Sequence, residues 1–228
     1  ATLPKEDFPV MASSEYASNF SAPAPVLRRL FDKSKFAIST EETRYYLNGV
    51  YLHVSDADGG KVLRCVATDG HRLARIDADL PDGASDMPGV IVPRKTVGEL
   101  RKLLEDDDMK IAVSVSETKI RFATPDITLT SKVIDGTFRV LNSAERLLEE
   151  DRLILSVNAP DSGAAEEELA VAYGDERLEI GFNAKYLLEI ASQVDRENAV
   201  FLFNSSGDPT LMREGNDMSA VYVVMPMR

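Results

Sequence analysis

Residues 62–77, VLRCVATDGHRLARID, contain two strand-like halves that meet at the sequence TDGH. An Asp-Gly pair between alternating apolar residues is a strong hairpin signal, because glycine readily adopts the positive φ that such a turn requires. Beyond the turn, the alternation of a strand places Leu73 and His71 on one face and Arg72 on the other. The stretch therefore predicts an antiparallel hairpin with one of the chain's two histidines at its turn.

The same kind of unit recurs outward from this hairpin. Helical periodicity is clear at residues 24–36, 92–108 and 182–194, and three strand-like segments follow each of these helices. The segments are residues 43–56, 61–67, 71–80, 110–117, 119–125, 127–135, 199–206, 210–215 and 219–227. A parallel βαβ fold would place a helix between successive strands, and this sequence does not. We therefore expect an α+β fold of repeated helix-plus-antiparallel-sheet modules, with the helices covering one face of the sheets.

Each expected helix has an apolar stripe that should face a sheet. In chain order, the three stripes are Val26, Leu27, Leu30 and Phe31; Val97, Leu100, Leu103 and Leu104; and Leu187, Leu188, Ala191 and Val194. The first two helices also carry cations on their other faces, namely Arg28, Arg29, Lys33, Arg94, Lys95, Arg101 and Lys102.

The net charge argues against a nucleic-acid partner, since 38 acidic and 26 basic residues leave a formal charge of -12. A polyanion responds to local charge, however, and aligned helices would gather their cations on one surface while the acids lie elsewhere. The alternative is that these are ordinary solvated helix faces. The residues alone leave both interpretations open.

Composition points to an ordinary soluble protein of 228 residues, long enough for one large domain or two of usual size. No apolar run approaches the roughly 18 residues of a membrane span. The start, ATLPKEDFPVM, lacks the basic lead and apolar core of a signal peptide, so we expect a cytoplasmic setting. The single cysteine, Cys65, lies in a strand-like segment and is expected to be a buried thiol.

Catalytic chemistry has little support in the sequence. Neither histidine has a nucleophile elbow beside it, and two histidines plus one cysteine on separate strands are a poor supply of zinc ligands. There is no Walker loop or GxGxxG motif, and the acidic run at residues 105–108 is typical of a solvated helix end. We therefore expect no catalytic residue, metal or cofactor. A metal-dependent nuclease that uses Asp69 or His71 is kept as an alternative.

Recognition of a partner is the better interpretation of the turn. At the end of the sequence, Pro226 lacks an N–H and should stop regular strand pairing, and Met225 and Met227 flank it. Flexible, polarizable methionines fill gaps in many cores, but they also suit a surface that accepts different apolar peptides. A peptide-binding scaffold with no role on DNA is the second alternative.

Several motifs in one order identify a family. They are RYYLNG, VATDGHRLA, VIVPRKTVGEL, TSKVIDGTF, LILSVNAPDSGAAEEELAVAY, EIGFNAKYLLEI and VYVVMPMR. Over nearly the whole chain, this series resembles the β subunit of bacterial DNA polymerase III, the replicative sliding clamp. The resemblance implies the DNA clamp fold, in which helices line a hole and sheets lie outside. It also implies a non-catalytic subunit of three similar domains that forms a head-to-tail homodimeric ring around duplex DNA.

The resemblance assigns residues 1–138 to the middle clamp domain and residues 139–228 to the C-terminal domain, with the first domain absent from the sequence. After the sequence DGTF at residues 135–138, the family has a proline-containing loop, a strand and a helix that we do not find here. We therefore expect that segments of the family are omitted after Phe138.

The resemblance also implies two sets of site residues. The pocket that receives short peptides would be formed by Leu47, Thr68, Gly70, His71, Arg72, Leu73, Asn183, Tyr186, Val223, Val224, Met225, Pro226, Met227 and Arg228. DNA contacts would come from Arg44, Tyr45, Tyr46, Arg94 and Lys95. The implied partners are duplex DNA and, through short peptide motifs, the polymerase III α subunit, the clamp loader, other polymerases and repair proteins. A full-length chain would form a homodimer, and no membrane partner is implied.

Overall fold

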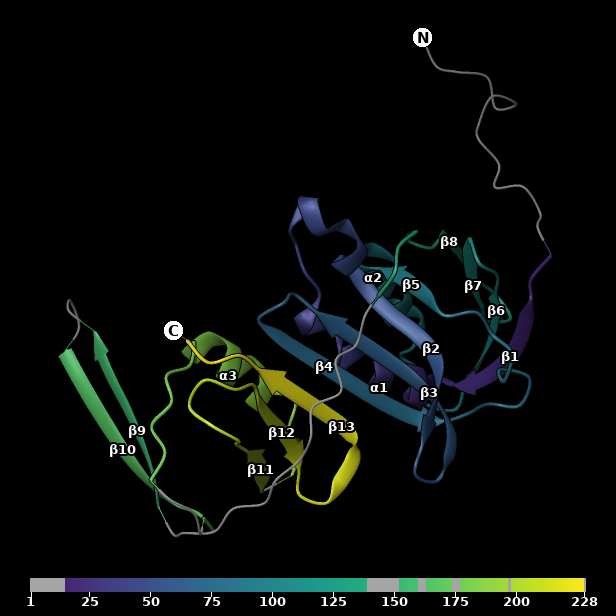
Figure 1. The fold of residues 1–228 in the computed structure, drawn as a ribbon. Coiled ribbons are helices and arrows are strands. Elements are labelled where there is room, and N and C mark those ends of the chain that lie inside the picture. The colour runs from purple at the N-terminus through teal and green to yellow at the C-terminus, as the bar shows by residue number, and fades with distance from the viewer. Residues whose placement is uncertain (1–14, 139–151, 160–162, 174–176, 197, 228) are drawn as a thin grey trace.

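The structure is a computed structural model that describes residues 15–138, 152–159, 163–173, 177–196 and 198–227 (Figure 1). Three α-helices lie in these residues: α1 (Ala24–Asp32), α2 (Arg94–Leu103) and α3 (Ala184–Ala191). Two short 3₁₀ helices, η2 (Lys35–Ala37) and η3 (Glu42–Leu47), follow α1. None of the described helices is both long and apolar enough to cross a bilayer.

The largest sheet has seven antiparallel strands and crosses most of the molecule. Its spatial order is β11 (Ala199–Leu202), β12 (Thr210–Glu214), β13 (Asp217–Val224), β4 (Arg72–Asp79), β3 (Gly60–Thr68), β2 (Gly49–Ala57) and β5 (Val90–Pro93). Figure 1 shows β4 and β13 side by side at its centre. The sheet therefore joins strands that are far apart in the sequence.

Two smaller antiparallel sheets complete the fold. The four-stranded sheet has the order β1 (Ser18–Pro23), β6 (Lys110–Val115), β7 (Lys119–Ala123) and β8 (Thr128–Lys132). The other is a hairpin of β9 (Arg152–Ala159) and β10 (Gly163–Ala170). The predicted repeat is confirmed, because β2–β4 follow α1, β6–β8 follow α2 and β11–β13 follow α3.

One core connects the three helices with one face of the seven-stranded sheet. Leu30 of α1, Leu100 of α2 and Ile190 of α3 belong to the same buried cluster. The strands contribute alternate side chains to it, such as Tyr222 and Val224 of β13, while the intervening side chains of that strand face the other side. Helices on one face of antiparallel strands are what the sequence predicts.

The predicted hairpin at the TDGH turn is confirmed. Thr68 is paired with Leu73, and Gly70 has a φ of 90°. Arg72 lies on the face of β4 that points to the main core, and Leu73 packs in a separate cluster on the opposite face. The prediction that His71 shares a face with Leu73 is not supported, because His71 precedes the strand and stacks on Tyr186 of α3.

The apolar stripe predicted for the third helix is only partly confirmed, because Leu187 packs against the core but two other members do not. Leu188 is 70% exposed and Ala191 is also exposed, whereas Ile190 is fully buried. At 100° per residue, Ile190 and Leu187 point to the sheet and Leu188 points away from it. The other two stripes agree with the structure, although Val26 and Leu103 are only partly buried.

The interior position of Cys65 is as predicted. Its side chain is fully buried in β3, and burial raises the pKa of the thiol above its ordinary value. A thiol in this position remains protonated and unreactive near neutral pH.

Candidate peptide and nucleic-acid interfaces

Backbone pairing brings the TDGH turn next to the C-terminal strand. Val223 lies opposite Leu73 and Val224 lies opposite Arg72 in the β13–β4 ladder. The pairing continues one step further, because the Met225 N–H donates to the His71 carbonyl at 2.8 Å. Two stretches that are about 150 residues apart therefore form one surface.

Side-chain hydrogen bonds make the turn rigid. Asp69 Oδ1 accepts from the backbone N–H groups of His71 at 2.9 Å and Arg72 at 3.0 Å. Thr68 Oγ1 donates to the Arg72 carbonyl at 2.7 Å and accepts from the Gly70 N–H at 3.1 Å. Asp69 thus caps the turn, which is a structural role. The nuclease alternative required the same carboxylate as a catalytic group.

The first turn of α3 closes the other side of this surface. Asn183 is the N-cap of the helix, and its Oδ1 accepts from the Lys185 N–H at 3.0 Å. Tyr186 stacks on His71 with 6.1 Å between the ring centroids. The Met227 N–H donates to the Gly181 carbonyl at 2.7 Å, so the tail is held just before α3 as well.

Burial separates the predicted peptide-site residues into two groups. Met225 and Met227 are 37% and 63% exposed, and Gly70 and His71 are also exposed. Val224 is fully buried, so it supports the surface from the core. The remaining described members are partly or nearly buried, namely Leu47, Thr68, Arg72, Leu73, Asn183, Tyr186, Val223 and Pro226. Arg228 lies outside the described residues.

Leu73 and Leu47 meet on the face of the sheet away from the helices. They pack with Val66 and Phe138 in a small apolar cluster. The structure therefore brings together the apolar members of the peptide site from the turn and from η3.

The loop of Arg44, Tyr45 and Tyr46 borders the same turn. A Cβ on Gly70 would lie only 2.7 Å from Arg44 Nη1, so the guanidinium rests against the glycine. Arg44 Nε donates to Glu41 Oε2 at 2.8 Å, and this hydrogen bond holds the pKa of Glu41 below its ordinary value. Tyr45 is 57% exposed and its ring contacts that of Tyr46 edge to face.

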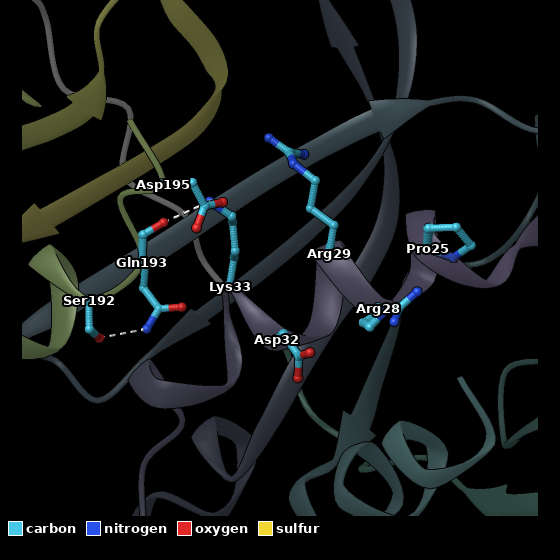
Figure 2. Close-up of a pocket in the computed structure, with 8 residues that line it drawn as sticks. All are labelled: Pro25, Arg28, Arg29, Asp32, Lys33, Ser192, Gln193 and Asp195. Atoms are coloured by element: carbon cyan, nitrogen blue, oxygen red, sulfur yellow. Dashed lines mark hydrogen bonds and ion pairs between the residues drawn. The ribbon is translucent and has the colours of Figure 1, made fainter. Parts of the chain in front are cut away.

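The cations of α1 are not free to meet a polyanion. Lys33 Nζ lies 2.7 Å from Asp195 Oδ2, 2.7 Å from Glu214 Oε1 and 2.6 Å from the Gln193 carbonyl oxygen. Figure 2 shows Lys33 reaching from α1 to the segment after α3, at the side of a cavity of about 370 Å³. Lys33 therefore neither faces a polyanion nor lies on an ordinary solvated helix face, because it bonds to another part of the protein.

Arg29 and Arg28 on the same helix are also occupied. Arg29 donates to the Asp77 carbonyl at 3.0 Å and to Ser219 Oγ at 2.6 Å, and it lies 3.6 Å from Asp217 Oδ2. Arg28 forms an ion pair with Asp107.

The start of α2 differs. Arg94 and Lys95 are exposed, and among the described residues we find no ion pair to either. Further along the helix, Arg101 pairs with Asp32 at 2.8 Å and Lys102 with Glu99 at 2.8 Å. The two α2 residues predicted to contact DNA are thus presented to solvent.

A metal site would need several histidine, cysteine, aspartate or glutamate side chains close together in the part of the chain that the structure describes. No group of three or more histidine, cysteine, aspartate or glutamate side chains is placed to hold an ion there.

Comparison with known families identifies the chain. Residues 22–139 match the model of the DNA polymerase III beta subunit, central domain, and residues 127–228 match that of the C-terminal domain. The chain belongs to the DNA polymerase III beta subunit family. Its residues thus span two domains of this family, and the β4–β13 pairing joins them in one sheet.

Relatives within the family are similar over most of their length. The beta sliding clamp of Caulobacter vibrioides is 42% identical over 260 residues, which cover 99% of this chain and 70% of that protein. The beta sliding clamp of Escherichia coli K12 is 33% identical, with 100% and 70% covered. Both alignments are longer than the 228 residues of the chain, so each includes gaps in this sequence.

Solved structures share the fold closely. The DNA polymerase sliding clamp of Caulobacter crescentus has a TM-score of 0.92 at 41% identity, and covers 99% of this chain and 70% of its own. A DnaN sliding clamp of Bartonella birtlesii, solved bound to griselimycin, has a TM-score of 0.89 at 43% identity with the same coverage.

Sequence reasoning missed two residues at the turn. Phe36 and Glu189 both contact Arg72, and neither belongs to the predicted site. The position of Glu189 one helical turn after Tyr186 is a weak signal that it faces the same neighbour.

Proposed function

We propose that this chain is the central and C-terminal part of a sliding clamp that encircles duplex DNA and tethers replication proteins to it. Family membership supports a non-catalytic processivity role. The observation that carries the tethering role is the meeting of the TDGH turn, the β13 tail and the first turn of α3. We assign residues 1–138 and 139–228 to the central and C-terminal domains.

On DNA, the mechanism is topological. A closed ring leaves DNA only when it opens, so the contacts inside it need only be weak and blind to sequence. Arg94 and Lys95, exposed at the start of α2, are suited to such phosphate contacts. Arg44, Tyr45 and Tyr46 are proposed as a second contact with DNA. A ring of this kind works on the chromosome, and we therefore place it in the cytoplasm.

The tethering surface offers exposed apolar groups beside a rigid turn. Met225 and Met227 can adapt to different apolar side chains, whereas the bonded turn gives them a fixed neighbour. We expect peptides of the polymerase III α subunit, the clamp loader, other polymerases and repair proteins to bind with about micromolar affinity, near -8 kcal/mol. Such binding raises the effective concentration of a polymerase at the primer end and still allows exchange.

Ring closure is the part of the proposal that needs a further domain. In our proposal a complete subunit pairs its first domain with the last domain of a second subunit, which gives a homodimer.

The test of tethering is a titration of the protein into a fluorescent peptide copied from the clamp-binding tail of the host polymerase, followed by anisotropy. We expect saturable binding that Leu73→Asp and Met225→Ala both weaken. Met218→Ala is the matched control. Met218 is 42% exposed on β13, but it lies at the end of this strand that is far from Met225. Failure of folded wild-type protein to bind, or equal weakening by Met218→Ala, would contradict the proposal.

A further inference from the structure

Arg72 differs from the exposed members of the peptide site. Its side chain is 9% exposed, and its Cζ lies 4.5 Å from the ring centroid of Tyr186 and 5.2 Å from that of Phe36. A guanidinium enclosed in this way is not positioned as a peptide contact. Its partners show what it does instead.

Three elements converge on this guanidinium. Nε donates to Asp69 Oδ2 of the turn at 3.2 Å, and Nη2 donates to the Phe36 carbonyl of η2 at 2.9 Å. Nη1 forms an ion pair with the carboxylate of Glu189 in α3. One cation therefore connects the turn, η2 and α3.

The contact with Glu189 bears directly on the predicted peptide surface. Glu189 follows Tyr186 by three residues, so both lie on the same side of α3. Tyr186 contacts the Arg72 guanidinium and stacks on His71. A charge-assisted pair at a nearly buried arginine is strong and directional, and its loss leaves part of that charge without a partner.

We propose that Glu189 is a positioning residue for the peptide surface. Through Arg72 it fixes α3 against the TDGH turn and thereby holds the Tyr186 ring beside His71. Peptide affinity then depends on Glu189 although its carboxylate points to Arg72. This inference rests on the tethering function proposed above, and it also makes a claim about the free protein.

The free protein is tested first, by NMR of the tyrosine rings, with Tyr186 assigned from the spectrum of Tyr186→Phe. We expect Glu189→Gln to shift the Tyr186 ring resonances, and Glu189→Asp, which keeps the charge, to shift them less. The Glu189 side chain is 34% exposed, so neither variant should prevent folding. Glu99→Gln is the matched control, since Glu99 also pairs with a cation but lies on α2. A variant that only lowered the overall stability would not shift the Tyr186 ring resonances more than those of the other tyrosines.

Peptide affinity is measured next, with the same polymerase-tail peptide carrying a tryptophan as the probe. The protein contains no tryptophan, so the fluorescence reports only the peptide. We expect Glu189→Gln to weaken binding about tenfold and Glu99→Gln less than twofold. The double variant Arg72→Gln/Glu189→Gln should bind about as weakly as Arg72→Gln alone, because the two residues act as one unit.

The outcomes separate the two proposals. Unchanged Tyr186 resonances in Glu189→Gln, with normal peptide binding by wild type, would overturn the positioning role and leave tethering intact. Strictly additive effects of the two substitutions would also overturn it. No binding by wild type would overturn tethering itself, and with it the dependence of affinity on Glu189.

Discussion

Helices α1 and α2 are alike in sequence and different in use. Both are amphipathic, both begin next to a proline, and both carry arginine and lysine on the face away from the core. In the structure, Arg29 of α1 and Lys33, the C-cap of that helix, are bonded to the C-terminal part of the chain, whereas Arg94 and Lys95 of α2 are exposed. The residue type alone therefore does not decide the role of a surface cation. What decides it is whether an acid faces it in the folded chain.

The acids that pair with Arg29 and Lys33 come from distant parts of the sequence. Asp195, Glu214 and Asp217 lie more than 160 residues after the helix, and they reach it because β13 pairs with β4. The start of α2 faces no such segment in the described residues. Four predictions test this difference between the two helices.

The largest effect is expected for Lys33→Met. Glu214 is only 4% exposed, and removing its main cation leaves a buried carboxylate poorly compensated. We expect the free energy of unfolding to fall by about 3 kcal/mol, measured by urea denaturation. Lys102→Met on α2, which removes an exposed lysine, should leave it nearly unchanged. Equal losses in both variants would remove the contrast between the helices.

DNA binding should show the reverse order. We expect Arg94→Ala/Lys95→Ala to weaken binding to a short linear duplex at low salt and to reduce the slope of log affinity against log salt by about 2, since each phosphate contact contributes about 0.9. Thermal stability should not change. Arg29→Ala should instead lower stability and leave the salt slope as in wild type. A salt slope that responds to Arg29 and not to Arg94 and Lys95 would refute the assignment.

A smaller effect is expected on the stability of the protein at acid pH. Burial raises the pKa of Asp217, but hydrogen bonds from Ser219 and the charge of Arg29 outweigh it, so the net pKa is below its ordinary value. A carboxylate with a lowered folded pKa stabilises the fold above its unfolded pKa of about 3.9, and this contribution is lost as the pH falls through the folded value. We expect Asp217→Asn to flatten the stability profile below about pH 4. A profile identical to wild type would show that the ionised Asp217 carboxylate, with its contacts to Ser219 and Arg29, carries no stabilisation.

The smallest expected effect is a difference in how salt changes two carboxyl pKa values, that of Glu99 on α2 and that of Asp217, which lies beside Arg29 of α1. The hydrogen bond and charge of Lys102 lower the pKa of Glu99 on α2, at an exposed position. We expect about 1 M salt to return this pKa toward its ordinary value, because exposed charges are screened. The pKa of Asp217 should stay lowered, since the Ser219 N–H donates to it directly at 2.8 Å. Carboxyl carbon NMR titrations at two salt concentrations measure both groups, and equal salt responses would contradict the distinction.

Local patterns predicted most of the elements, because each pattern is a local property of the chain. The turn at Gly70, the buried Cys65 and the recurring helix with three strands follow from residue types and spacing. Leu188 was misplaced, because a short helix offers more than one apolar stripe and only its packing partner selects between them.

Residue types favoured partner recognition at the turn and at Met225 and Met227, but the full set of site residues came from the family resemblance and was incomplete. Nothing local in the sequence indicates that Met225 lies beside His71, or that Arg72 is enclosed by Phe36, Tyr186 and Glu189. These contacts depend on the pairing of two strands that are about 150 residues apart. The family resemblance placed Arg72 in the peptide site, and the structure shows its side chain nearly buried.

The pairing of β13 with β4 also sets when this surface can first exist during synthesis. The TDGH hairpin can form from local contacts, but its neighbour in the sheet, residues 217–224, is translated about 150 residues later. A nascent chain therefore carries the turn without the methionines and without the α3 contacts. On the tethering proposal, partners that require the whole surface therefore bind only chains in which β13 has been made and paired.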